Sequence, residues 1–486
     1  MAFVCLILSL IFLSTDASSL VSPPKSAVVI AFEDAYDLSL LANTISDLGT
    51  ETTLVIPFEE NNYYEHLISV EVIKINASLQ SSDTNDAKAL RLCESFISDS
   101  NVSNHVKLIQ PTFIIFPAVR HDACLLPWAA SISAIPVIWA RGHYEELYAF
   151  IKTGMALPVH ETGLLQSFIE NLNLKYFLYS LEFNYVVPVQ RLMYKKLPEI
   201  DTTIANLYST TQLILWGADP ILRMNSALLT QLVAEIGCHH CRGSQPLPPD
   251  IQKELVEFRA GTIVILLDQV HDSLVRAIAQ KLPHDRQGLA VIWKNKSARL
   301  HNKPSNLFIH KDVDRQDLIG YSRARMVLCH CTDSEFLESA FHGTPMICFP
   351  RTMDEKRNAQ RALELGFAYI EKIEAMSDTV TEIIKTIHEN SKYRESARLV
   401  SQAIRDRSNH AMDRIQYWLG YVARHNGEGK NLLLPKRVST YNEILQAVAG
   451  FLVGVFFTTL VTILFFMTQH VTESQSKKES KKKHRK

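Results

Sequence analysis

Two series of apolar segments alternate with helix-like segments along this chain, and this alternation limits the fold more than any other feature. The first series begins at Ser26–Phe32 (SAVVIAF), and the second begins at Gly261–Leu267 (GTIVILL). Short apolar runs separated by helical patterns are typical of buried parallel strands joined by crossover helices. Two such series therefore predict an α/β protein with two Rossmann-like, doubly wound domains that face a cleft.

The remaining predicted strands divide between the two series. They are Thr53–Ile56, Phe113–Pro117 and Ile135–Trp139 in the first, and Leu289–Trp293, Asn306–Ile309, Met326–His330 and Pro345–Phe349 in the second. A cluster of Gly, Pro and polar residues at Gly237–Pro248 lies between the series. We therefore expect an N-terminal domain over residues 20–240 and a C-terminal domain over residues 241–442, with helices after Lys392.

Both ends of the chain carry segments that belong to neither domain. Residues 1–19 are a short apolar run followed by small residues, which predicts a cleaved signal peptide; a buried strand or an anchor is the alternative. Ile444–Met467 is free of charged residues, and its 24 residues exceed the roughly 30 Å of bilayer hydrocarbon when helical. The sequence predicts a transmembrane helix there.

The charge of the C-terminal tail orients this predicted membrane helix. Residues 471–486 carry six Lys and one Arg against two Glu, a net charge of +5, whereas the whole chain has −1. The positive-inside rule places the basic tail, residues 468–486, in the cytosol and the body in the lumen. A near-neutral body does not favour nucleic-acid binding. The terminal Lys482–Lys486 approximates a dibasic endoplasmic-reticulum retrieval signal, although a basic run that anchors the helix at headgroups is the alternative.

Sequons, cysteines and a small-residue motif agree with a lumenal body. Asn76, Asn101 and Asn295 each begin an Asn-x-Ser sequon, so we expect a glycoprotein. Seven cysteines remain after signal cleavage, and an odd number leaves at least one unpaired or bonded to another chain. The pair Cys238 and Cys241 forms a CxxC, for which incidental or structural cysteines, a redox pair and half a metal site all stay open. The GxxxG at Gly450 and Gly454 is compatible with a homo- or hetero-oligomer.

Four stretches of the second half resemble one enzyme family. They are IGCHHCRGSQPLPPDIQKELVEF, AVIWKNKSARLHNKPSNLFIHKDVDRQDLIG, LCHCTDSEFLESAFHGTPMICFP with the following DEKRNAQRALELGFAYI, and DRIQYWLGYVARHNG. In content and order they resemble the UDP-glycosyltransferases, the membrane-bound UDP-glucuronosyltransferases most of all. The resemblance implies a GT-B fold, a UDP-sugar donor on the C-terminal domain, a lipophilic small-molecule acceptor on the N-terminal domain, no metal and no other cofactor. It also implies inverting transfer of a hexosyl or glucuronosyl group.

The donor-site residues that this resemblance carries over are altered. The family's His-Gly-Gly-x-Asn falls on His330, Cys331, Thr332 and Ser334, with the later acid at Glu338. Thr332 and Glu335 have the spacing of a capping box, whose side chains would satisfy the N–H groups that a diphosphate needs. Asp333 and Glu335 add negative charge there, and inward-pointing Arg315 and Arg351 would offset it.

The positions that would bind the sugar and the uracil of the donor differ in how far they depart from the family. The family's Asp-Gln pair falls on Asp354 and Glu355, and Asn358 also matches, so the sugar end looks serviceable. The family's uracil-binding Trp-x-Pro-Gln falls on residues 312–315, which end in Arg315 and contain no aromatic platform.

The two catalytic positions of the N-terminal half are also changed. The family's catalytic base falls on Tyr36, a poor base at neutral pH, and its orienting acid falls near Phe116. His121 and Asp122 are the nearest substitutes, although an exposed loop pair is the plainer interpretation.

Two functions compete on this sequence, and whether the chain is an enzyme stays open. A non-catalytic homologue of the endoplasmic-reticulum membrane, a pseudoenzyme that binds a lipophile or acts as a partner subunit, is favoured because the base, diphosphate and uracil positions all depart together. An active UDP-glycosyltransferase with a rearranged site, using His121 and Asp122 or His330, is the alternative. A thiol-active protein using Cys238 and Cys241 is a third, weaker hypothesis.

Overall fold

The protein is described here from a computed structural model. It describes residues 25–32, 35–57, 69–75, 84–118, 120–141, 146–154, 156–157, 164–219, 228–229, 232–267, 271–294, 303–311, 313–372, 377–425 and 448–468. The expected signal peptide, the sequons at Asn76 and Asn295, and the basic tail lie outside these residues. Contacts divide the chain into a unit that ends at Leu433 and a unit that begins at Leu434.

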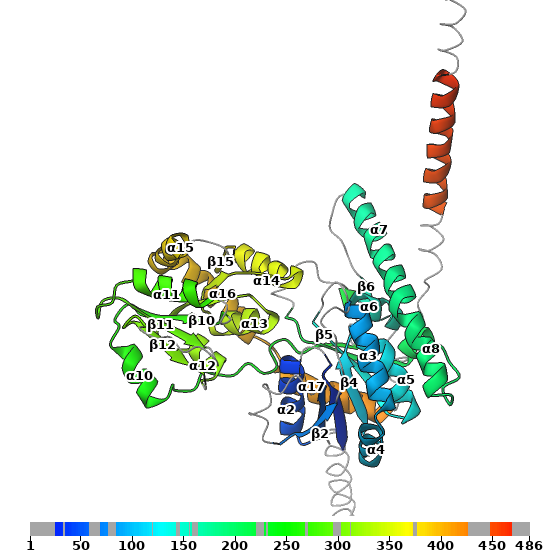
Figure 1. Ribbon diagram of the computed structural model, residues 1–486, viewed down its shortest axis with the longest axis horizontal. Helices are drawn as coiled ribbons and strands as arrows, with labels where there is room; N and C mark the ends of the chain where they lie inside the picture. The colour runs from blue at the N-terminus through cyan, green and yellow to red at the C-terminus, as the bar shows by residue number, and fades with distance from the viewer. Residues whose placement is uncertain are drawn as a thin grey trace, which may run out of the picture. The chain divides into compact units, whose positions relative to one another are not determined.

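The first sheet has seven strands in the order β3-β2-β1-β4-β5-β7-β9 (Figure 1). All six pairs of neighbouring strands within it are parallel. Its strands are β1 (Ser26–Ile30), β2 (Glu51–Pro57), β3 (Glu71–Ile75), β4 (Phe113–Pro117), β5 (Ile135–Ala140), β7 (Leu213–Trp216) and β9 (Val233–Glu235). The helices of this part are α2 (Ala35–Asp47), α3 (Asn85–Ser98), α4 (Ser100–Ile109), α5 (His121–Ser131), α6 (Leu147–Thr153), α7 (Leu164–Leu181), α8 (Val187–Lys196) and α9 (Ile204–Thr210). A π-helical turn, Glu182–Val186, joins α7 to α8, and β6 (Ala156–Leu157) pairs with β8 (Leu228–Leu229).

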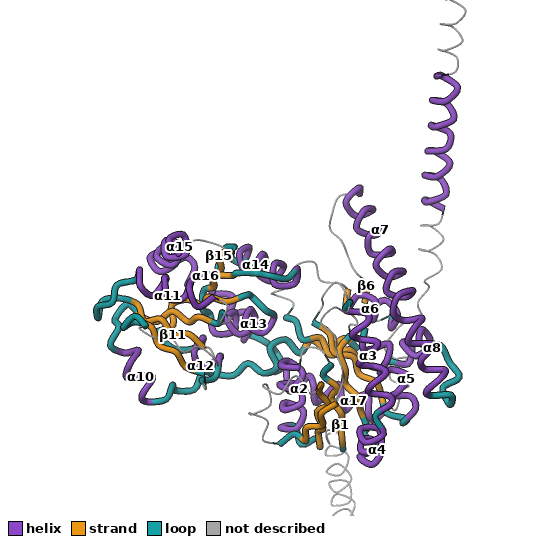
Figure 2. Tube along the Cα trace, viewed as in Figure 1, coloured by secondary structure: helices purple, strands orange, loops and turns teal. Residues whose placement is uncertain are grey.

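The second sheet has six parallel strands in the order β12-β11-β10-β13-β14-β15 (Figure 2). These are β10 (Gly261–Ile265), β11 (Leu289–Lys294), β12 (Leu307–His310), β13 (Ala324–Cys329), β14 (Met346–Cys348) and β15 (Ala368–Ile370). Its helices are α10 (Pro249–Val256), α11 (Asp272–Lys281), α12 (Arg315–Ile319), α13 (Asp333–His342), α14 (Met353–Glu364), α15 (Ser377–Glu389) and α16 (Ser391–Arg405). Both predicted doubly wound sheets are therefore present. The strand order reverses between β1 and β4 in the first sheet and between β10 and β13 in the second. Such folds bind ligands at the point where the order reverses.

The last helix of the body returns to the first sheet. In α17 (Ala411–His425), the side chains of Ile415, Leu419 and Val422 are buried in the same apolar cluster as strands β1, β4 and β5. Their spacing of three and four residues gives one apolar face. The first sheet is thus covered by α2 and α17 on one side, and the chain crosses between the two sheets twice.

The second unit contains one described helix, Val448–Thr468, which is long and apolar enough to cross a membrane. All of its residues are exposed. A helix with a largely apolar surface is stable in lipid because its internal N–H and C=O groups are paired within the helix. The helix lies within four residues of the predicted span Ile444–Met467 at its start and one at its end.

Candidate functional site

The turn after β13 has a shape that glycine favours, although it holds no glycine. His330 is buried, and its Nδ1 lies 3.0 Å from the carbonyl oxygen of Phe349. Cys331 has a φ of 67°, in the left-handed region that side chains rarely adopt. Thr332 then caps α13. The turn therefore places a buried thiol at a left-handed backbone position that glycine would favour.

The predicted capping box at this turn is confirmed. The Glu335 N–H donates to Thr332 Oγ1 over 3.4 Å, and the Thr332 N–H donates to Glu335 Oε2 over 3.0 Å. An anion at a helix N-terminus binds through such unpaired N–H groups. Here two of these groups already have an acceptor from within the turn.

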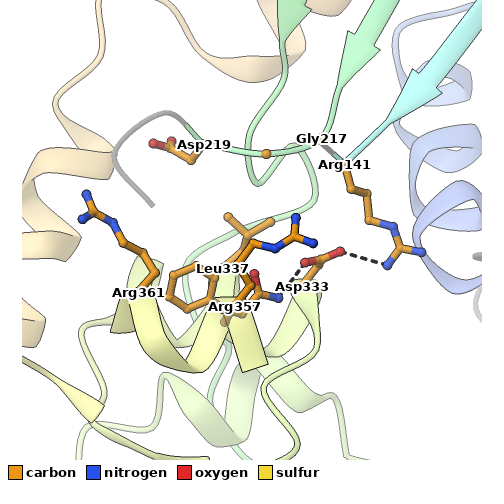
Figure 3. A pocket seen from close by; sticks show the side chains of 10 residues that line it. Arg141, Gly217, Asp219, Asp333, Leu337, Arg357 and Arg361 are labelled. Atoms are coloured by element: carbon orange, nitrogen blue, oxygen red, sulfur yellow. Dashed lines mark hydrogen bonds and ion pairs between the residues drawn. The ribbon is translucent and has the colours of Figure 1, made fainter. Parts of the chain in front are cut away.

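An arginine bridge joins this turn to the first sheet's helix α2. Arg141 Nη1 lies 3.3 Å from Asp37 Oδ2 and 3.1 Å from Asp333 Oδ2. Figure 3 shows the contact with Asp333 as a dashed line. The Ser334 hydroxyl donates to Asp37 Oδ1, and Asn358 Nδ2 donates to Asp333 Oδ1 over 2.7 Å. We call the two ion pairs of Arg141, with Asp37 and with Asp333, the Arg141 bridge. Burial raises the pKa of Asp37, the Ser334 hydroxyl lowers it, and the nearby Asp333 charge raises it.

Glu338 is completely buried and is contacted by the side chains of Arg315 and His240. Arg315 Nε and Nη2 each donate to one of its carboxylate oxygens over 2.6 Å, and His240 Nε2 lies 3.0 Å from Oε1. Burial acts to raise the pKa of Glu338, but the Arg315 charge and these hydrogen bonds outweigh it and lower the pKa to about 2. The Arg315 guanidinium also lies 4.9 Å from the centroid of the Tyr36 ring. Arg315 therefore stabilises Glu338 and Tyr36 rather than the turn at Thr332.

The start of α14 repeats the capping pattern. Glu355 Oε2 accepts hydrogen bonds from the N–H groups of Arg351 and Thr352, over 2.6 and 3.0 Å. The Arg351 side chain lies 3.2 Å from Glu355 Oε1, so it points to its own helix. Asp354 pairs with Arg357 at 2.8 Å. Of the predicted sugar-end residues, only Asn358 contacts the turn after β13, where it also donates to the Cys331 carbonyl over 3.2 Å.

The residues at the family's catalytic positions do not form a base and its orienting acid. Tyr36 lies in α2, and burial raises its pKa, so the phenol stays protonated at neutral pH. Phe116 is fully buried within β4. His121 and Asp122 begin α5, directly after that strand, and are buried rather than exposed on a loop, which corrects the plainer interpretation of this pair.

The surroundings of His121 and Asp122 make them a poor pair of base and orienting acid. The His121 ring packs edge-on against Phe32, with centroids 5.4 Å apart. Burial raises the pKa of Asp122 to about 8, although the Ala123 N–H donates to its carboxylate over 2.8 Å. A carboxyl group that is largely protonated at neutral pH cannot stabilise an adjacent imidazolium as the family's acid does.

The cysteines of the described residues form two disulfides and three buried thiols. The disulfides are Cys93–Cys124 and Cys238–Cys241. Cys238, His240 and Cys241 have their side-chain ligand atoms within 4.8 Å of one another, the geometry of a metal cluster. Metal binding needs thiolates, and the disulfide removes two of them. The thiols of Cys329, Cys331 and Cys348 lie in the core, where burial raises the pKa of each.

Three residues of this site were missed in the sequence: Asp37, Arg141 and His240. Arg141 lies two residues after the end of the predicted strand at Trp139, and a charged residue at the carboxyl end of a buried parallel strand is a usable signal. Asp37 and His240 gave no such signal. Their partners are 297 and 98 residues away in the chain.

Comparison with solved structures identifies the fold. The fold matches the crystal structure of CalG4, the calicheamicin glycosyltransferase, with a TM-score of 0.60 and 16% identity over 83% of this chain and all of that one. It also matches a UDP-glucosyltransferase from Polygonum tinctorium, with a TM-score of 0.56 and 14% identity over 84% of this chain and 99% of that one. The two parallel-sheet domains are those of the GT-B glycosyltransferase fold.

The family follows from the sequence. The family model described as "UDP-glucoronosyl and UDP-glucosyl transferase" matches residues 10–483, so the chain belongs to this family. It is 29% identical to UDP-glucosyltransferase 2 of Dactylopius coccus over 51% of this chain and 50% of that one. It is 23% identical to UDP-glucuronosyltransferase 1A9 of Mus musculus, over 76% of this chain and 72% of that one, and 23% identical to UDP-glucuronosyltransferase 1A7 of Homo sapiens, over 75% and 71%. The match thus spans about half of the insect relative and about seven-tenths of the mammalian ones.

Proposed function

We propose that this chain is a membrane-anchored member of the UDP-glycosyltransferase family that has lost glycosyl transfer and acts as a lipophile-binding protein or partner subunit. One observation carries the proposal: the N-terminus of α13, where the family holds the donor's diphosphate, is filled by the chain's own carboxylates. Glu335 accepts from the Thr332 N–H, and Asp37 accepts from Ser334. A diphosphate would have to displace these groups and sit beside Asp333 as well.

The absence of a base at the matching position supports the same conclusion. Tyr36 is protonated at neutral pH, and its ring faces the Arg315 guanidinium rather than an acid that could take its proton. General-base catalysis requires a group that is deprotonated near the working pH and is within hydrogen-bond reach of the acceptor hydroxyl. Losing both the base and the anion site removes the two largest contributions to this reaction.

The proposed location is the endoplasmic-reticulum membrane. The apolar helix Val448–Thr468 supports membrane attachment, and the basic residues that follow it support a cytosolic tail. The signal-like residues 1–19 and the three sequons support a lumenal, glycosylated body. The two disulfides agree with an oxidising compartment.

One observation favours the alternative, an active enzyme with a rearranged site. A buried acid whose pKa is raised to about 8, such as Asp122, is a form that general acids and bases take. His121 lies beside it at the carboxyl end of β4. An enzyme of this kind would need both residues and a donor bound against the carboxylates at α13.

Turnover separates the two functions. The full chain in lipid nanodiscs is incubated with UDP-glucuronate or UDP-glucose and a panel of phenols, and released UDP is measured. We expect release no greater than that from the His121→Ala and His330→Ala variants. Release from the wild-type chain that disappears in either variant would contradict the proposal and establish the rearranged enzyme.

A further inference from the structure

The two disulfides of the described residues differ in how accessible they are. Cys238 and Cys241 are partly exposed and lie in the segment between β9 and α10. Cys93 and Cys124 are completely buried, in α3 and α5. Thiol–disulfide exchange requires a thiolate to reach one of the two sulfurs. A dissolved thiol can therefore reach the first disulfide in the folded chain, but it reaches the second only after the fold opens.

The two disulfides also close different lengths of chain. Cys238 and Cys241 are 3 residues apart in the sequence, whereas Cys93 and Cys124 are 31 apart. A disulfide stabilises a fold more when it closes a longer loop, and chain entropy makes this difference about twentyfold in the folding equilibrium constant. The turn at Cys238 also has a backbone hydrogen bond, from the Cys241 N–H to the Cys238 carbonyl over 3.0 Å. We therefore expect the fold to survive cleavage of Cys238–Cys241.

His240 places a hydrogen-bond donor beside one sulfur of this pair. Its Nε2 lies 3.9 Å from Cys238 Sγ and 3.0 Å from Glu338 Oε1. Glu338 is ionised at neutral pH, since its pKa is about 2, and an ionised carboxylate only accepts hydrogen bonds. Nε2 therefore carries its hydrogen, and Cys238 Sγ is within reach of the same N–H. A histidine beside a cysteine in a Cys-x-x-Cys motif stabilises the thiolate.

The other surroundings of Cys238 make this contact important. The Cys238 side chain packs against an apolar cluster of the second sheet, and apolar contact disfavours a thiolate. The nearby Glu338 carries a negative charge, but Arg315 donates to both of its carboxylate oxygens over 2.6 Å and compensates that charge. The stability of a Cys238 thiolate should therefore depend on His240.

We propose that Cys238–Cys241 is a reversible redox pair that exchanges with external dithiols, and that His240 stabilises the Cys238 thiolate. A thiolate of the dithiol attacks Cys241 Sγ, the Sγ–Sγ bond breaks, and Cys238 leaves as the thiolate. The second thiol of the dithiol then attacks the dithiol's own sulfur in the mixed disulfide and releases Cys241. Two electrons and two protons pass from the dithiol, which becomes a disulfide, to the pair, which becomes two thiols. The inference does not depend on the proposed function, because no sugar donor takes part.

The test compares the two disulfides within one sample of the full chain in lipid nanodiscs. Dithiothreitol is the dithiol, N-ethylmaleimide stops the reaction at successive times, and peptide mass mapping identifies the alkylated cysteines. We expect Cys238 and Cys241 to become alkylated together, at least about tenfold faster than Cys93 and Cys124, because access limits exchange. After dithiothreitol is removed, oxidised glutathione should restore the Cys238–Cys241 disulfide.

The His240→Phe variant tests the role of the imidazole. Phenylalanine keeps a ring but removes the N–H, while Glu338 keeps its two hydrogen bonds from Arg315. Reduction of Cys238–Cys241 should slow by about threefold or more, because a less stable thiolate leaves more slowly. The matched control is His284→Phe, which makes the same substitution at an exposed histidine after α11 and should leave the rate unchanged.

Three outcomes would each overturn the inference. They are equal reduction rates of the two disulfides, a Cys238–Cys241 pair that stays oxidised in excess dithiothreitol while the chain is folded, and equal rates in His240→Phe and His284→Phe. The comparison of the two disulfides needs no variant, so a folding defect in His240→Phe cannot obscure it.

Discussion

Removing Arg141 should destabilise the body because Arg141 is the cation between two nearly buried carboxylates. At separations of 3.3 Å from Asp37 and 3.1 Å from Asp333, each attraction amounts to about 5 kcal/mol at an effective dielectric constant of 20. Most of this is offset by desolvation, since the three side chains are only 12–15% exposed. Breaking such a bridge from one side leaves uncompensated charge, so we expect Arg141→Ala to lower the free energy of unfolding by about 3 kcal/mol.

The carboxylates of Asp37 and Asp333 provide a second, more selective test. If the loss comes from uncompensated charge, neutralising both acids should recover part of it. The Arg141→Ala, Asp37→Asn, Asp333→Asn triple variant should therefore be more stable than Arg141→Ala alone, by at least about 1 kcal/mol. The penalty of Arg141→Ala should also shrink as the pH falls, because burial raises the pKa of Asp37 and the folded variant gains stability as Asp37 takes up a proton.

Urea denaturation, followed by tryptophan fluorescence on the full chain in nanodiscs, measures both statements. The matched control is Arg286→Ala, which removes an exposed arginine and should change the unfolding free energy by less than about 0.5 kcal/mol. A triple variant no more stable than Arg141→Ala would refute the charge-based account. The loss would then come from the packing of the arginine stem against Trp139, whose ring centroid lies 5.2 Å from the guanidinium carbon.

Three further predictions concern stability and modification. Glu338→Gln should lower the free energy of unfolding by about 3 kcal/mol at pH 7, because the pKa of Glu338 is lowered from 4.5 to about 2. This contribution is complete above pH 4.5 and is lost as the pH falls toward 2. The difference in unfolding free energy between variant and wild type, measured in urea, should therefore narrow in acid, and a constant difference would contradict the prediction. Burial lowers the pKa of His342 from 6.5 to about 4, so the unfolded chain binds one more proton than the folded chain between these pH values. Stability therefore falls as the pH drops from 6.5 to 4. His342→Gln should reduce the dependence of the denaturation midpoint on pH in this range, and an unchanged dependence would show that His342 does not titrate on unfolding. Asn101 is exposed in the first turn of α4 and is therefore accessible for glycosylation. Enzymatic deglycosylation should lower the mass of the wild-type chain by one glycan more than it lowers the mass of Asn101→Gln. Equal mass shifts would count against lumenal glycosylation at this position.

Local signals in the sequence predicted most of the fold and part of the site. Strands such as Ser26–Ile30 and Gly261–Ile265 are continuous apolar runs, and the capping box at Thr332 and Glu335 depends only on residues three apart. These features follow from local chemistry and hold in any tertiary context. Two of the strands missing from the prediction, Val233–Glu235 and Ala368–Ile370, have three residues each and show no periodicity of their own. Two others, Glu71–Ile75 and Leu213–Trp216, have five and four residues, and runs this short are hard to assign from periodicity.

The contacts between the two halves of the site could not be predicted from the sequence. Arg315 was expected to offset the negative charge at Thr332–Glu335, but α12 aims it at Glu338 and Tyr36. The partner of Asp333 is Arg141, 192 residues earlier in the chain. Such pairings depend on how two sheets and their helices pack, and neither periodicity nor spacing carries that information.

The central claim is that the N-terminus of α13 does not accept the diphosphate of a donor. Calorimetric titration of the full chain in nanodiscs with UDP tests it most directly, with the Asp37→Asn variant titrated alongside because that substitution removes one charge from the site. The account predicts no saturable binding to the wild-type chain up to millimolar UDP, while the same sample unfolds cooperatively in urea. Saturable binding of UDP at micromolar to low millimolar concentration would contradict it, because the carboxylates of Asp37, Asp333 and Glu335 would then tolerate a diphosphate beside them.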